Sequence, residues 1–215
     1  MLESEQNGGT QATATIRSAI NRLQWFTMAW MSVEVAVALF AAVRARSVAL
    51  AAFGGDSAIE LLSAAAVLWR FRSSRETAEI IATRVTGWLL IALGVFIAAA
   101  SLYTLAAAGT KPRPSYAGIA LLVAAAVIMP WLGRRKRQLA TTANSTALRA
   151  DAAQSSICGY MAWIALGGLL LNALGHLSWA DPVSALGLLP IVIHEAKEAL
   201  EGRSCCAQAD GQGCH

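Results

Sequence analysis

Long apolar stretches alternate with short polar or basic ones along this chain, a pattern typical of a protein with several membrane-spanning helices. A helix needs about 20 mainly apolar residues to cross the hydrocarbon core of a bilayer. The pattern predicts six spans, over residues 25–43, 47–69, 86–107, 116–132, 148–174 and 181–193. The helix of the last span is expected to continue out of the membrane and to end at Gly202.

Polar residues suggest where these helices begin and end. The basic run Arg134-Arg135-Lys136-Arg137 is expected to end the fourth helix. Asp181 and Pro182 are expected to open the sixth, as the N-cap and the first helical residue. The chain should thus consist of a disordered, polar N-terminal tail (1–18), a six-helix membrane domain (19–202) and a Cys-containing tail (203–215).

The composition and the distribution of charge agree with an all-α integral membrane protein. Of 215 residues, 56% are hydrophobic and 14% are charged, whereas soluble domains carry about 25% charged residues. Abundant Ala, Leu and Gly suit closely packed membrane helices. Lys and Arg lie at the ends of the apolar runs and form no stripe with stacking aromatics, so nucleic acid is not an expected partner.

The same basic residues predict the topology. With six spans both termini lie on one side, and 13 of the 17 Lys and Arg residues lie on that side. Cytoplasmic loops carry the excess of Lys and Arg. We therefore expect a multi-pass protein of the cell membrane, in contact with the lipid bilayer, with both termini in the cytoplasm.

Two carboxylates lie deep within the second predicted span. Asp56 and Glu60 are four residues apart, so a helix places them on one face. An ionised carboxylate at that depth costs about 2.5–3.5 kcal/mol, and such residues usually mark a functional site. The pair is a candidate cation site. The alternative is a structural pair bonded to backbone groups or to a nearby Arg.

The fifth span carries a second polar pair at the same spacing. Cys158 could be a metal ligand or a small buried apolar residue, and Gln154 could be a ligand or an interhelical hydrogen-bonding group. Asp151 is expected to stabilise the start of its helix through the helix dipole and to have an accessory role near the site. Glu34, deep in the first span, has three possible parts: an extra ligand, a proton relay or the partner of a polar group on another helix.

These segments together resemble the transmembrane domain of the cation diffusion facilitator family, which are divalent metal efflux proteins. The similarity covers about residues 20–202. Where the family has a His or Asp pair in helix five, this chain has Gln154 and Cys158, and only 13 residues follow Gly202, so the family's cytoplasmic domain is not represented. The matching pieces are Asp56 and Glu60 in helix two, Ala150-Asp151 with Gln154 and Cys158 in helix five, Asp181-Pro182 before helix six and Glu198-Ala199-Leu200 after it.

The resemblance implies a six-helix exporter that exchanges a divalent metal ion for protons, and a homodimer held by its helices alone. No catalytic residue and no tightly bound cofactor are expected, so the protein should not be an enzyme. Two carboxylates with a thiolate would suit zinc or a neighbour such as cadmium. Because the ligands must be deprotonated to bind metal, loading the ion would release protons. The expected metal ligands are Asp56, Glu60, Gln154 and Cys158.

A different class of function also fits these residues, a membrane protein that binds metal as a sensor or buffer without transporting it. The C-terminal tail bears on this alternative, because Cys205, Cys206, Cys214 and His215 are soft donors close together. They could form a metal-collecting arm or simply a disordered tail with reactive thiols.

Overall fold

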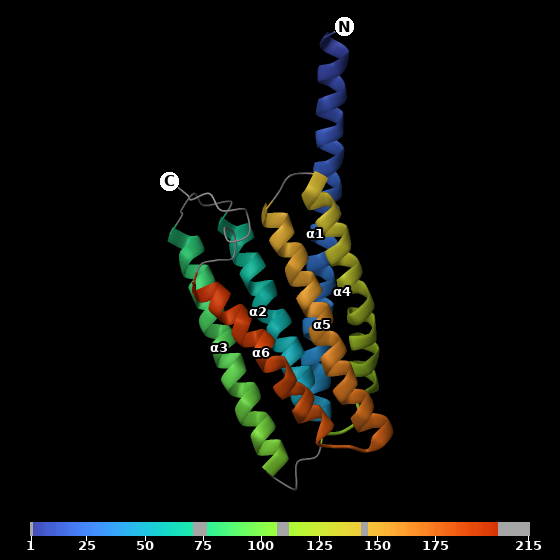
Figure 1. The fold of residues 1–215 in the computed structure, drawn as a ribbon, viewed down its shortest axis with the longest axis vertical. Helices are drawn as coiled ribbons and strands as arrows, with labels where there is room; N and C mark the ends of the chain where they lie inside the picture. The colour runs from blue at the N-terminus through green and yellow to red at the C-terminus, as the bar shows by residue number, and fades with distance from the viewer. Residues whose placement is uncertain (1, 71–76, 107–111, 143–145, 202–215) are drawn as a thin grey trace.

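Six helices run up and down through the described part of the chain. The computed structural model describes residues 2–70, 77–106, 112–142 and 146–201. Successive helices alternate in direction, so the start of α1 and the end of α6 lie at the same end of the bundle (Figure 1). The helices are α1 (Leu2–Ala45), α2 (Val48–Arg70), α3 (Thr77–Ala106), α4 (Tyr116–Thr142), α5 (Thr146–Gly175) and α6 (Ala180–Leu200).

The all-helical class is confirmed in these residues, and two helices extend further than predicted. α4 continues through the basic run at 134–137 to Thr142, because Arg, Lys and Gln are good helix formers and the run contains neither Pro nor Gly. α1 begins at Leu2, so residues 2–18, expected to be disordered, are helical. The first proline of the chain is Pro112, so no proline interrupts this long helix. Its N-terminal part projects beyond the other helices (Figure 1).

Small residues allow the helices to approach closely. The most extensive contacts are those of α4 with α5, α3 with α6 and α1 with α2. A Cβ on Gly159 of α5 would lie 2.9 Å from the ring of Pro130 in α4. A Cβ on Gly54 of α2 would lie 2.9 Å from the Cβ of Ala38 in α1. Both distances are too short for real Cβ atoms, so these crossings depend on glycine, as is typical of membrane helices.

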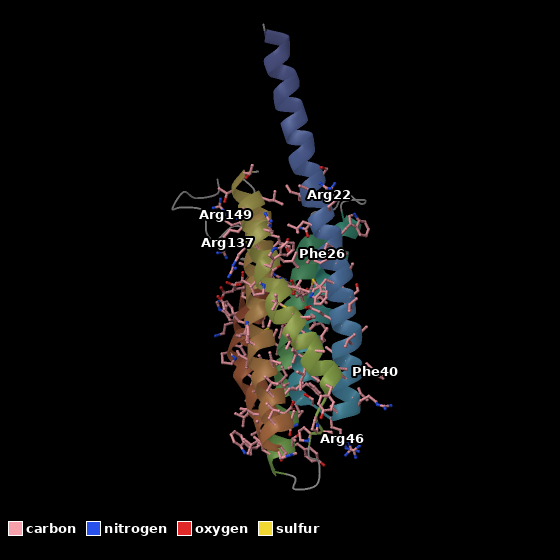
Figure 2. All side chains as sticks on the ribbon, turned by 90° about the vertical axis from the view of Figure 1, so that its right-hand side faces the viewer. Arg22, Phe26, Phe40, Arg46, Arg137 and Arg149 are labelled. Carbon is pink, nitrogen blue, oxygen red and sulfur yellow. The ribbon has the colours of Figure 1, made fainter. Side chains whose placement is uncertain are left out.

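Large apolar side chains cover the outside of the bundle. Phe40 of α1, Trp88 of α3 and Trp163 of α5 are each more than half exposed, and Phe40 points outward in Figure 2. Within the described ranges, four helices, α1, α3, α4 and α5, are long and apolar enough to cross a membrane. Exposed apolar surface of this extent on several helices marks an interaction with lipid or protein.

Basic side chains gather at one end of this bundle. Arg22, Arg137 and Arg149 lie at the end where α1 enters, whereas Arg46 lies at the opposite end (Figure 2). This is the unequal distribution from which the cytoplasmic side was predicted.

Asp181 joins the start of α6 to the start of α2. It was expected to cap its own helix, but α6 begins at Ala180 and its N-cap residue, Trp179, makes no side-chain capping bond. The fully buried Asp181 carboxylate instead accepts hydrogen bonds from the Ser47 hydroxyl and, at 2.8 Å, from the backbone N–H of Val48. A carboxylate suits this place because the N-terminus of a helix carries unpaired N–H groups and a partial positive charge.

We expect Asp181→Ala to lower the free energy of unfolding by about 2–3 kcal/mol, because it leaves the buried Ser47 hydroxyl and Val48 N–H without their acceptor. Thermal unfolding of the purified protein in detergent measures the effect. Glu198→Ala is the matched control, since it removes an exposed carboxylate from the same helix. Equal unfolding temperatures for the two variants would contradict the structural role of Asp181.

Candidate functional site

Asp56 and Glu60 face the interior of the bundle from α2. Asp56 is 2% exposed. Glu60 is partly buried, but its Oε2 atom is inaccessible and has no hydrogen-bond partner among the described residues. Gly54 and Gly55 precede them, and Cβ atoms there would lie 2.9 Å from Ala38 of α1 and 2.8 Å from Leu93 of α3. The glycines thus allow α2 to pack closely against α1 and α3 just before Asp56 in the sequence.

Cys158 and Gln154 face the same interior from α5. Cys158 is a free thiol, 1% exposed, and it interacts electrostatically with the carboxyl groups of Asp56 and Glu60. Gln154 is half-buried and donates a hydrogen bond to another carboxyl group, that of Glu195. The two pairs proposed from the sequence therefore lie on helices that pack together, α2 and α5.

Glu195 of α6 is the main acidic residue of this region that the sequence analysis missed. Its Oε1 atom accepts a 3.1 Å hydrogen bond from Gln154 Nε2, and its carboxyl group is hydrogen bonded to that of Asp56. Two carboxyl groups can share a hydrogen bond only if one of them carries a proton. Glu195 thus links α2 to α5.

Helical spacing could have placed Glu195 in the interior. The segment from His194 onward was expected to lie in water, yet Leu188, Val192, Glu195 and Ala199 are all buried and recur every three or four residues. This repeat is that of one face of a helix. The interior face of α6 therefore continues past the point where charged residues begin.

Glu34 of α1 is fully buried and lies near the proposed ligands Cys158 and Glu60. Its Oε1 accepts a hydrogen bond from Trp30 on its own helix, while Oε2 has no partner among the described residues. It interacts electrostatically with Cys158 and with Glu60. Of the three expectations for Glu34, a bond to a polar group on another helix is not seen in the described residues, and the other two remain predictions.

A second polar cluster lies between α4 and α5. Lys136, 1% exposed, donates to Asp151 Oδ1 at 2.8 Å and to Ser155 Oγ at 2.9 Å. Asp151 Oδ2 accepts a further 2.8 Å hydrogen bond from Gln24 of α1. Asp151, expected near the helix start, is thus the acceptor that joins α1, α4 and α5.

Lys136 was predicted to be one of four basic residues that mark the cytoplasmic side. The other three, at 134, 135 and 137, are exposed as expected. Lys136 instead follows the buried positions Met129, Leu132 and Gly133 at helical spacing. A buried Lys must be paired, and Asp151 supplies the partner.

The described residues contain no group of three or more His, Cys, Asp or Glu side chains arranged to hold a metal ion. His176 and His194 are exposed. His194 lies 3.5 Å from Glu198 across one helical turn. The tail residues Cys205, Cys206, Cys214 and His215 lie outside the described residues.

We expect Cys158 to resist thiol reagents, because its side chain is buried between helices. A variant with Ser at 205, 206 and 214 keeps it as the single cysteine. Mass spectrometry should find little maleimide adduct in detergent and complete modification after unfolding in sodium dodecyl sulfate. The control adds Y160C and C158S to this background, since Tyr160 is 66% exposed. Equal modification rates in the two proteins would contradict the burial of Cys158.

No protein-family model and no curated protein matches the chain. The case for a function therefore rests on the side chains buried in the bundle.

Proposed function

We propose that this protein exports a divalent transition metal ion, zinc or a soft neighbour such as cadmium, across the cell membrane in exchange for protons. In this proposal all six helices span the membrane, both termini are cytoplasmic and the ion binds between α2 and α5. The observation that carries the proposal is the set of ionisable side chains buried where α2, α5 and α6 meet. Its members are Asp56, Glu60, Cys158 and Glu195, with Gln154 bonded to Glu195.

The free energy of burying charge supports a functional role for these residues. Acidic side chains inside membrane helices are costly and rare, and those that occur usually lie on ion or proton pathways. Here Asp56 and Cys158 are nearly inaccessible, and a buried oxygen of Glu60 has no partner among the described residues. A purely structural acid would be expected to use its acceptor atoms in hydrogen bonds. The free Glu60 oxygen can accept a cation.

The chemistry of the donors favours a borderline metal. Carboxylate oxygens and a thiolate together suit zinc or cadmium better than magnesium or calcium, which prefer all-oxygen shells. The described side chains are not assembled into a metal site, so binding would require them to rearrange. Asp56 would have to exchange its hydrogen bond with Glu195 for the metal ion.

That exchange provides a route for proton coupling. A proton shared by the Asp56 and Glu195 carboxyl groups would be released when the ion takes its place, because metal ligands bind in their deprotonated form. Renewed protonation from the opposite side of the membrane would expel the ion. Export against protons is the direction that fits an acidic exterior. A homodimer is part of the proposal and would be formed by contacts between the exposed apolar faces of the helices.

Flux of Zn²⁺ into inverted vesicles, followed with an encapsulated fluorescent indicator, is the test. We expect uptake that depends on an inward-acidic pH gradient and falls at least about tenfold in Asp56→Ala and in Glu60→Ala, because each removes a carboxylate that the ion needs. The matched control is Glu198→Ala, an exposed carboxylate of α6. Saturable Zn²⁺ binding without any flux would favour the sensor or buffer alternative and overturn transport.

Metal preference should depend on the thiol. In a titration of Zn²⁺, Cd²⁺ and Mn²⁺ against the purified protein, Cys158→Ser is expected to weaken Cd²⁺ binding more than Mn²⁺ binding, since soft ions gain most from a thiolate. Ser156→Ala is the control on the same helix, because its hydroxyl bonds the backbone of Ala152. An unchanged order of affinities in Cys158→Ser would rule out the thiol as a ligand.

A further inference from the structure

Lys136 is a buried cation that the proposed transport reaction leaves unused. It lies in α4 at 1% exposure, and two of the three donors of its ammonium group bind Asp151 and Ser155. Asp151 is itself fixed by Gln24 of α1. The ammonium is therefore held in a defined place by two side chains of α5, one of which is fixed in turn by α1.

This ammonium is bound to the helix that carries two of the proposed ligands, Gln154 and Cys158. Ser155 is adjacent to Gln154 in α5 and three residues before Cys158. Lys136 interacts electrostatically with Glu60 of α2. Glu60 has a buried oxygen without a hydrogen-bond partner among the described residues. An ammonium on a flexible four-carbon chain can shift between neighbouring acceptors.

We propose that Lys136 is a tethered counter-cation that competes with the transported metal ion for Glu60, and that Asp151 sets the strength of this competition by holding the ammonium away from the site. The inference rests on the proposed function. In the empty protein the ammonium offsets the negative charge of Glu60. When a divalent ion enters, the ammonium remains with Asp151, and its positive charge keeps the ion from binding too tightly to be released.

The alternative is a structural ion pair that only fastens α4 to α5. Buried ion pairs add little net stability, while loss of one partner is strongly destabilising. A structural pair predicts that every single substitution in it weakens folding and, with it, metal binding. A competing cation predicts effects of opposite sign, because the lysine opposes the metal ion and its carboxylate partner restrains the lysine.

Zn²⁺ affinity of the purified full-length chain, measured by competition with a fluorescent chelator at fixed pH, separates the two. We expect K136M to bind Zn²⁺ at least about tenfold more tightly than the wild type, because a unit positive charge near a divalent ion is removed. D151N should bind about tenfold more weakly, since the released ammonium pairs with Glu60. K197M, which removes an exposed lysine of α6, is the matched control and should bind as the wild type does.

The double variant K136M/D151N keeps the test decisive if K136M alone does not fold. Removing the ammonium from the D151N background should restore the affinity that D151N lost. Weaker binding in K136M, equal affinities of K136M and K197M, or no recovery in the double variant would each overturn the inference.

A second arm separates this inference from the proposed function. Loss of Zn²⁺ binding in D56A/E60A together with no gain in K136M would overturn the role of Lys136 alone. Undiminished binding in D56A/E60A would overturn the proposed site, and the competition with it.

Discussion

An apolar bundle must give every buried polar or charged group a partner, because leaving one unpaired costs several kcal/mol in a medium without water. The interior polar groups of this protein follow that constraint with few exceptions. Asp181 accepts hydrogen bonds from the Val48 N–H and the Ser47 hydroxyl at the start of α2. Lys136 and Asp151 neutralise each other, and Gln154, Glu195 and Asp56 form a hydrogen-bonded chain across three helices. Each of these contacts fixes one helix against another.

Two of the exceptions are acidic side chains that lie near the same thiol. Among the described residues the buried side-chain atoms without a partner are Oε2 of Glu34, Oε2 of Glu60 and the hydroxyl oxygen of Ser101. Glu34 and Glu60 both interact electrostatically with Cys158. Apart from the Ser101 hydroxyl, the buried side-chain polar atoms of the described residues have partners, whereas two acidic oxygens near Cys158 do not. Unsatisfied acceptors in one place are the physical basis for proposing a cation as their partner.

The lengths of the apolar runs were enough to predict the helices, because long apolar runs separated by short polar segments are typical of membrane-spanning helices. Helical spacing also predicted that Asp56 and Glu60 share one face of a helix and that Gln154 and Cys158 share one face of another, since residues four apart share a face. The prediction was wrong for charged residues that are buried. Lys136 was grouped with three arginines and Glu195 with the charged end of α6, although both continue a buried repeat. The partners that make their burial tolerable, Asp151 and Asp56, lie on other helices, and sequence spacing within one helix cannot reveal them.

The bond from Asp181 to Ser47 and Val48 constrains how the helices of the site could move. α2 and α6 cannot part at that end without exposing an N–H and a hydroxyl to an apolar interior. Asp56 lies about 12 Å along α2 from this junction, and Glu195 about 21 Å along α6, at 1.5 Å per residue. Any relative displacement of the two helices is therefore smallest at the junction and grows toward the end where α1 enters. An opening that frees Asp56 from Glu195 would accordingly splay α2 and α6 about Asp181 and admit water from that end first.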